Sequence, residues 1–248
     1  PSLIISAGGN TLFASIALAR ATRIANTFSG TLKGYSPSNI TNIFTVTPLE
    51  GVKNNTALDL PPANIEPAQN NKPTKPFYTL LVGGDGAGYR YSNEDWTQLA
   101  QAMHAIAKRD GITWKVTTSR RTGEEAELKL KSVLQENCIS EAIWFSSNPQ
   151  KVVKHFLAEG SVIFCTEDSL TMVSEAIYAH KPAVTLQPNT MKPERNDALA
   201  LEKYQAKKYI IRSPIKTLAQ LQVDADLFCE NYPDIHRQIA DALLVNIK

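Results

Sequence analysis

The sequence predicts an α/β fold built on parallel sheets, and two observations point to it. From residue 77 onward, short apolar segments alternate with helical segments of about three turns, as in βαβ units whose parallel sheet is covered on both faces. A strand followed by a glycine turn and a helix also occurs twice, over 4–11 and 80–95, which indicates two similar α/β halves.

The composition is that of an ordinary globular chain. Its 248 residues allow one large domain or two modest ones, each able to bury a core. Because 26 Lys and Arg nearly balance 24 Asp and Glu, bulk charge does not favour nucleic acid or an anionic membrane. No apolar run approaches the ~18 residues that a membrane-spanning helix needs.

Cysteines and histidines argue against two classes of site. Cys138, Cys165 and Cys229 are widely spaced, and the four histidines show no HxxxH pattern. We therefore expect neither a disulfide framework nor a metal held by the protein, and we expect a reducing, cytoplasmic location.

The first 47 residues predict part of a Rossmann-like domain. The pattern favours a strand, a glycine turn with capping side chains, a helix and two β-branched strands, over 2–6, 7–11, 12–24, 27–35 and 42–46.

A proline-rich segment at 48–76 is the best candidate for a domain boundary. Six of the 14 prolines fall within it, together with an Asn-rich stretch, and proline disfavours both helix and central strand. The segment is expected to be a linker or an extended crossing between domains.

The second Rossmann-like domain is expected over 77–223. Its predicted strands are 77–82, 113–118, 142–145, 162–165, 183–186 and 209–212, and its predicted helices are 93–109, 124–136, 149–159, 170–180 and 196–206. A helical tail interrupted at Pro233 is expected over 224–248.

The first candidate site is the glycine loop Gly83-Gly84-Asp85-Gly86, between a strand and a helix. Glycines at a strand end let the backbone approach a ligand, and the next helix offers its amino end to phosphate. The order of glycines is neither the GxGxxG fingerprint nor a Walker loop, so a simple flexible turn is the alternative.

The second candidate is Ser119-Arg120-Arg121-Thr122, again after a strand. Adjacent arginines suit phosphate through bidentate hydrogen bonds, and solvated surface arginines are the alternative. Ser119 or Thr122 is also a candidate helix cap, with Glu125 completing a capping box.

The third candidate combines a strand end with the start of a helix. It comprises Asp168, Ser169, Thr171, Met172 and Glu175. The free amides of the helix suit an anion, and the Glu175 carboxylate could accept hydrogen bonds from a ribose diol. The plainer interpretation is a cap at Asp168 or Ser169, a core methionine and a solvated Glu175.

All three loops are expected at the carboxyl edge of one parallel sheet. Ligands bind along that edge in open α/β sheets. The coincidence favours a nucleotide or phosphosugar site.

The segments LLVGGDGAGY, TTSRRT and FCTEDSLTMVSEAIYAHKPAV, in this order, resemble the family named after the plant "elongated mitochondria" fission protein, which has bacterial members. That family is similar to GT-B glycosyltransferases. The resemblance is strong from about residue 79 to 186 and loose elsewhere, and His180 departs from it where a glycine is usual.

The resemblance implies two Rossmann-like domains in a GT-B-like fold, the first one incomplete here, and a final helix that returns to it. It implies that a nucleotide sugar is held mainly by the second domain. The glycine loop would face a cleft, Arg120 and Arg121 would meet the diphosphate, Ser169 and Thr171 would supply helix-end contacts, and Glu175 would hold the ribose. Gly8, Gly9 and Asn10 would form a loop on the acceptor side.

The function expected from this resemblance is transfer of a sugar from a nucleoside diphosphate to a cell-envelope acceptor. Neither a cofactor nor a bound metal is expected, and contact with the inner membrane is expected to be peripheral at most. A non-catalytic adaptor is the alternative, because no Asp, Glu or His precedes Glu50 to act as a base. A nucleotide-sugar epimerase is a third reading, with Asp85, Glu167 and Asp168 as candidate acids and bases.

Overall fold

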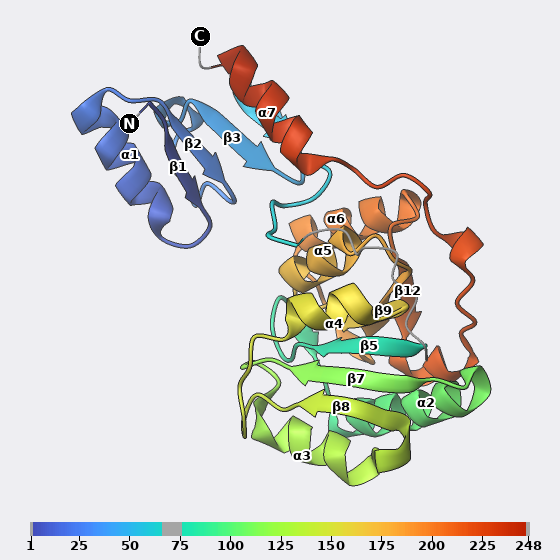
Figure 1. Ribbon diagram of the computed structural model, residues 1–248. Coiled ribbons are helices and arrows are strands. Elements are labelled where there is room, and N and C mark those ends of the chain that lie inside the picture. Colours follow the sequence, from blue (N-terminus) through green and yellow to red (C-terminus); the bar gives the residue numbers. More distant parts are fainter. Residues whose placement is uncertain (1, 66–75, 247–248) are drawn as a thin grey trace. The chain divides into compact units, whose positions relative to one another are not determined.

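The computed structural model describes residues 2–65 and 76–246, which form two compact units (Figure 1). The first unit combines the stretch up to Pro62 with the stretch from Pro233 onward, and the second runs from Ala63 to Tyr232. Each unit has its own parallel sheet.

The first unit contains a sheet of four parallel strands in the order β1-β2-β3-β4. The strands are β1 (Ile4–Ala7), β2 (Asn26–Ser29), β3 (Asn42–Thr45) and β4 (Asn55–Ala57). Helix α1 (Thr11–Thr22) follows β1, and its Leu12 and Ile16 pack with Phe28 and Ile43 of the sheet.

Strand β4 lies inside the segment expected to be a linker. The side-chain amide of Asn55 donates hydrogen bonds to the Ile43 carbonyl and to Thr45 Oγ1, at 3.1 and 2.9 Å, and Leu58 and Leu60, which follow the strand in the chain, are buried. Residues 49–60 hold no proline, so a strand can form there. Residues 66–75 of that segment lie outside the described residues.

Strand β2 is shorter than the strand expected over 27–35. It ends at Ser29 because Gly30, Lys33 and Gly34 all have positive φ, which is incompatible with an extended strand.

The first unit also includes helix α7 (Ile235–Asn246) from the other end of the chain. The Asp59 amide donates to Gln238 Oε1 at 3.1 Å, and Gln238 Nε2 donates to Asp59 Oδ2 at 2.9 Å. The rest of the expected tail holds only the 3₁₀ turn Ala225–Leu227 before Pro233.

The second unit has six parallel strands in the order β12-β10-β9-β5-β7-β8. They are β5 (Phe77–Val82), β7 (Thr113–Thr118), β8 (Ile139–Ile143), β9 (Val162–Thr166), β10 (Ala183–Gln187) and β12 (Ile211–Pro214). Counted in chain order, this is the doubly wound arrangement 3-2-1-4-5-6, whose direction reverses between β5 and β9.

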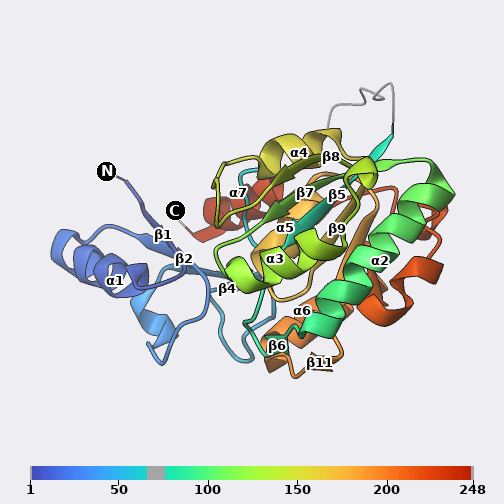
Figure 2. The same cartoon turned by 90° about the horizontal axis from the view of Figure 1, so that it is seen from below.

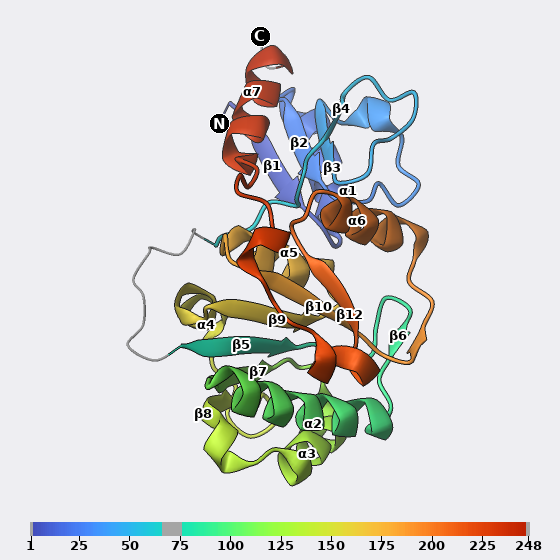
Figure 3. The same ribbon diagram turned by 90° about the vertical axis from the view of Figure 1, so that its right-hand side faces the viewer.

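Helices cover both faces of this second sheet (Figure 3). Helices α2 (Asn93–Asp110) and α3 (Gly123–Val133) lie on one face, and α4 (Val153–Glu159) and α5 (Leu170–Tyr178) lie on the other. In chain order, helix α6 (Arg195–Ala206) comes between β10 and β12. The remaining 3₁₀ turns are Pro37–Asn39, Glu136–Cys138 and Ile215–Gln220. No helix in the described ranges combines the length and the apolarity that crossing a bilayer requires.

A short antiparallel ribbon projects from the second unit. Strand β6 (Tyr89–Arg90) pairs with β11 (Thr190–Met191) beside the start of α2 (Figure 2). Neither strand is predicted by the sequence pattern, because two residues are too few to show a period.

Candidate functional site

The three predicted loops follow three adjacent strands of the second sheet. The glycine loop follows the middle strand, β5, and the other two loops follow its neighbours β7 and β9. Because the strand order reverses between β5 and β9, the glycine loop and Asp168 lie at the topological switch point, where open α/β sheets bind ligands.

Two glycines let the loops come together. A Cβ on Gly83 would overlap the Asp168 carboxylate, and a Cβ on Gly84 would overlap the main-chain carbonyl of Arg121. The Gly83 amide donates to Thr166 Oγ1 at 2.7 Å, so this amide holds the fold together and does not point to a ligand. Glycine is required here for close approach of neighbouring protein segments.

The second loop is fastened to the first by Thr122. Its hydroxyl lies 3.0 Å from the Val82 carbonyl, close to the Gly83 carbonyl, and it accepts a hydrogen bond from the Ser119 amide at 2.9 Å. The expected cap of α3 at Ser119 or Thr122 is wrong. Thr122 occupies the capping position but makes no capping bond, because its hydroxyl is bonded to the end of β5, and the Ser119 hydroxyl accepts from the Arg121 amide at 3.2 Å, before the helix begins.

Arg121 joins the second loop to the third. Its Nη2 lies 2.7 Å from Oδ2 of Asp168, whose side chain is fully buried, and its Nη1 donates to the Asp168 carbonyl at 3.4 Å. Burial raises the pKa of Asp168, while a hydrogen bond from Thr166 and the charge of Arg121 lower it in part. The Arg121 side chain is 40% exposed, so its guanidinium also reaches the surface.

Arg120 behaves differently from its neighbour. It is exposed, and its side chain has no ion pair or hydrogen bond with the part of the chain that the structure describes. Its charge is therefore available to an anion.

The third loop ends in the first turn of α5. Ser169 caps this helix by accepting a hydrogen bond from the Met172 amide at 3.4 Å, so the capping role expected for Ser169 is confirmed. The first-turn amides have no partner inside the helix and present the positive end of its dipole. Thr171 is exposed and Met172 is half-buried beside them.

Glu175 lies in the second turn of the same helix and is half-buried. Burial raises the pKa of its carboxyl group, and the charge of Lys154 opposes this shift. Within residues 2–65 and 76–246, no group donates a hydrogen bond to this carboxylate. Its hydrogen-bonding capacity is therefore left for a ligand or water.

The buried Glu167 carries a network that the sequence did not predict. Arg212 donates to both carboxylate oxygens, at 2.7 and 2.8 Å, and Thr185 and Tyr89 add further hydrogen bonds at 2.6 and 3.1 Å. These donors hold Glu167 in the fold and leave it poorly placed to exchange a proton with a substrate. Asp85, in contrast, is exposed and accepts only the Tyr91 amide, at 2.9 Å, among the described groups.

The predicted acceptor-side residues lie in the first unit, after β1. Gly8 and Gly9 have φ of +55° and +53°, and both are exposed, as is Asn10. Asn10 makes no capping bond, while Thr11 Oγ1 lies within hydrogen-bond distance of the Ala7 and Gly8 carbonyls.

The fold of the chain is shared with several solved structures. MurG from Acinetobacter baumannii matches with a TM-score of 0.56 and 13% identity over 98% of this chain and 73% of that one. The MnaA–UDP co-structure from S. aureus matches with 0.56 and 14%, over 98% and 70%. A putative UDP-N-acetylglucosamine 2-epimerase from Listeria monocytogenes matches with 0.56 and 13%, over 89% and 64%. The predicted α/β, GT-B-like fold of Rossmann-like units is confirmed.

Within this fold class, the chain belongs to the family described as Mitochondrial fission ELM1, which matches residues 37–222. The suspected family is thereby confirmed. A curated relative, the uncharacterized protein RP120 of Rickettsia prowazekii (strain Madrid E), is 23% identical over 155 residues. The match spans 60% of this chain and 42% of that relative's length.

Proposed function

We propose that the second unit binds the nucleoside diphosphate of a nucleotide sugar, and that the protein is a GT-B-like glycosyltransferase acting on a cell-envelope acceptor. The observation that carries this proposal is the meeting of three loops at the switch point, where Arg121, the start of α5 and Glu175 lie on adjacent elements.

Each of these features suits one part of such a ligand. Guanidinium groups and a helix amino end stabilise phosphate, which favours Arg120, Arg121 and the first turn of α5 for the diphosphate. A half-buried carboxylate without an internal donor favours Glu175 for a ribose diol. The S. aureus MnaA–UDP co-structure shares the fold, which supports a uridine nucleotide as the first ligand to test.

The same groups would assist the reaction. As the bond between the anomeric carbon and the diphosphate oxygen breaks, negative charge builds up on the diphosphate, and fixed positive groups stabilise that charge. The acceptor oxygen would form the new bond to the anomeric carbon and lose its proton. No cofactor or protein-bound metal enters this proposal, and the released proton passes to a general base or to water.

A non-catalytic adaptor is the second candidate, and one observation favours it. The sequence up to Leu49 contains no Asp, Glu or His, so the loops that follow β1, β2 and β3 lack an ordinary general base up to that point. An epimerase has less support, because Glu167 and Asp168 are already held by Arg212 and Arg121.

Calorimetric titration with uridine, cytidine, guanosine and thymidine diphosphates tests the proposal. We expect one nucleotide to bind, and we expect Arg120→Gln and Glu175→Gln each to raise its Kd about tenfold or more, since hydrogen bonds to charged groups contribute about 1.5–3 kcal/mol. Glu124→Gln, on the exposed first turn of α3, is the control and should leave Kd unchanged.

Arg121 needs a compensated variant. Removing it alone leaves the buried Asp168 carboxylate unpaired and destabilises the fold, so Arg121→Gln is combined with Asp168→Asn. The double variant should unfold as cooperatively as the wild type and bind the nucleotide more weakly. If the wild-type chain binds none of the four nucleotides, the donor site is rejected and the adaptor becomes the preferred function.

A further inference from the structure

The loop that follows β8 carries an exposed aromatic side chain. Phe145 lies two residues beyond the end of the strand and is 38% exposed. In the described part of the second unit, it is the only aromatic residue among the large apolar side chains that are exposed. Its ring contacts neither another ring nor a cation within the described ranges, whereas the Trp144 ring has Lys131 Nζ 4.8 Å from its centroid. Phe145 therefore offers a free aromatic face.

A buried carboxylate fixes the main chain around Phe145. Glu127 is 1% exposed, and its Oε1 accepts hydrogen bonds from Thr118 Oγ1 at 2.5 Å and from the Ser146 amide at 3.2 Å. The Ser146 hydroxyl donates to the same carboxylate. Thr118 Oγ1 in turn accepts a hydrogen bond from the Phe145 amide at 2.8 Å. Since two successive amides are held in this way, the backbone that carries the exposed ring is already ordered before any ligand binds.

The same contacts place Phe145 beside the second candidate loop. Strands β7 and β8 run parallel and side by side (Figure 1), with Thr117 opposite Ile143. Continued by two residues, this pairing brings the residue before Arg120 opposite Phe145, and the hydrogen bond from the Phe145 amide to Thr118 agrees with it. Neighbouring strands lie about 4.8 Å apart, so the exposed ring and the arginine loop start from adjacent positions.

Arg120 and Phe145 together suit a ligand with an anionic part and an aromatic part. The Arg120 side chain is exposed and has no partner among the described residues, so its guanidinium is available to a phosphate group. A free aromatic ring stacks on a planar heterocycle, and every nucleobase has such a face. A nucleotide carries both groups in one molecule.

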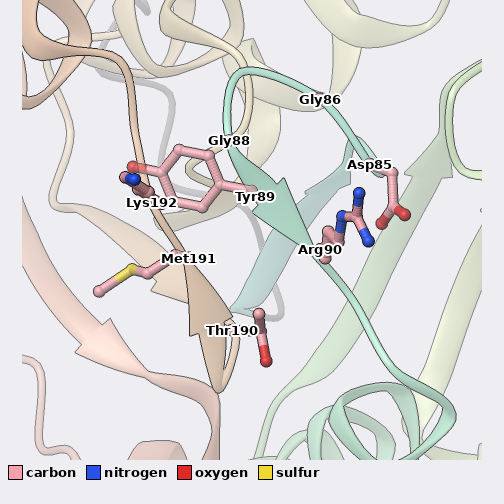
Figure 4. A pocket seen from close by; sticks show the side chains of 8 residues that line it. All are labelled: Asp85, Gly86, Gly88, Tyr89, Arg90, Thr190, Met191 and Lys192. Atoms are coloured by element: carbon pink, nitrogen blue, oxygen red, sulfur yellow. The ribbon is translucent and has the colours of Figure 1, made fainter.

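The pocket next to the glycine loop is the competing place for a base (Figure 4). Its volume of about 730 Å³ is within the range of small-molecule sites. The aromatic ring in its lining is Tyr89, which is 1% exposed and donates its hydroxyl to Glu167 at 3.1 Å. Figure 4 also shows Lys192 beside this ring. A base in this pocket would find no open ring to stack on, so the observations favour Phe145.

We propose that Phe145 stacks on the base of the bound nucleotide, while Arg120 holds its diphosphate. This inference rests on the proposed function, because it assigns the base of the same donor. It adds the loop after β8 to the site, which then extends from β9 to β8 along the carboxyl edge of the sheet. Since stacking does not depend on the hydrogen-bonding edge of a base, Phe145 contributes affinity and leaves the choice of base to other groups.

Calorimetric titrations of four variants of the full chain test the inference. The ligands are the tightest-binding nucleoside diphosphate and inorganic pyrophosphate, the latter also as its competitor. Phe145→Ala should raise the Kd of the nucleotide about tenfold and leave pyrophosphate unchanged, because only the nucleotide has a base to stack. Phe145→Tyr keeps the aromatic face and should bind as the wild type does. Arg120→Gln should weaken both ligands, and the control Leu128→Ala, which removes another exposed apolar side chain, should weaken neither.

Proton NMR of the bound nucleotide distinguishes stacking from a structural role of the ring. We expect nuclear Overhauser effects between the base protons and a phenylalanine ring. They should disappear in Phe145→Ala and persist in Leu128→Ala.

The outcomes separate this inference from the proposed function. If the nucleotide binds but its Kd is unchanged in Phe145→Ala, or the base shows no contact with a phenylalanine ring, the inference is wrong and the donor site stands. Loss of pyrophosphate binding in Phe145→Ala would show that the ring supports the arginine loop, which also contradicts stacking. If the wild type binds no nucleoside diphosphate, the donor site and this inference are both rejected.

Discussion

Asp168 is the residue whose charge most directly couples the three loops. Its carboxylate is buried at the switch point, beside Gly83 and within 2.7 Å of Arg121. Burial raises its pKa above the ordinary value of 3.8 in spite of Arg121, so desolvation outweighs the attraction of the guanidinium. The ion pair therefore fixes the position of Arg121, while the burial of the charged Asp168 carboxylate lowers the stability of the fold.

The pH dependence of stability tests this balance. Because the pKa of Asp168 is higher in the folded state, the folded protein binds this proton more tightly, and stability falls as pH rises from about 4 through the folded-state pKa. Asp168→Asn should lack this component, so its stability relative to the wild type should improve with rising pH in urea denaturation. The exposed Asp226→Asn serves as control. A constant difference between Asp168→Asn and the wild type across about pH 4–7 would contradict the shift.

The sequence predicts local contacts of single residues and misses distant ones. The cap at Ser169 is predictable because its partner lies three residues away. The contacts of Arg121 with Asp168 and of Arg212 with Glu167 join residues 47 and 45 positions apart, and no single-chain pattern pairs them. The Thr122 hydroxyl likewise bonds to the carbonyl of Val82, 40 positions away, and therefore does not cap α3 as expected.

At the scale of elements, α2 and β11 are linked through Asp95. This carboxylate caps the helix and holds Asn189 with separate oxygens. The short β6–β11 ribbon is therefore connected by hydrogen bonds to α2, one of the longest helices of the second unit.

A double-mutant cycle measures this link. Asp95→Ala should cost roughly 1–3 kcal/mol, because it removes a cap and leaves neighbouring donors unsatisfied, and Asn189→Ala should cost about 1 kcal/mol. Since the two residues share hydrogen bonds, the double variant should lose less than the sum, by about 0.5 kcal/mol or more, in urea denaturation. Additive losses would show that the capping role of Asp95 is independent of β11.

The strands that the sequence predicts best are those with buried apolar runs. All five residues of β9 are buried, and the boundaries expected for β5 and β7 agree with the structure. The strand expected over 142–145 runs instead over Ile139–Ile143, because the polar Ser140 and Glu141 interrupt the apolar pattern at its start and apolar residues continue the pattern past its end. The strand expected over 209–212 begins at Ile211, because the apolar pattern already starts at Tyr209. Strand β4, with the sequence Asn-Thr-Ala, has no such run and is missed.

At the scale of the whole molecule, the residues proposed to bind the donor all belong to the second unit. We therefore expect a nucleoside diphosphate at about 100 times its Kd to stabilise the protein by about 2.7 kcal/mol and to raise Tm by roughly 5–10 °C. Hydrogen exchange should slow at residues 83–86, 119–122 and 168–175 and stay unchanged at Gly8, Gly9 and Asn10. Equal protection in both units would contradict a donor site confined to the second one.

The hydrogen bonds between Asp59 and Gln238 join residues separated by 179 positions. During synthesis, β1 to β4 leave the ribosome long before α7, whereas all of the second unit is already available when α7 emerges. Contacts of such high sequence separation form late and slowly. The first unit therefore cannot complete its fold until α7 has been made, whereas the second unit, which lies between its two parts in the chain, can.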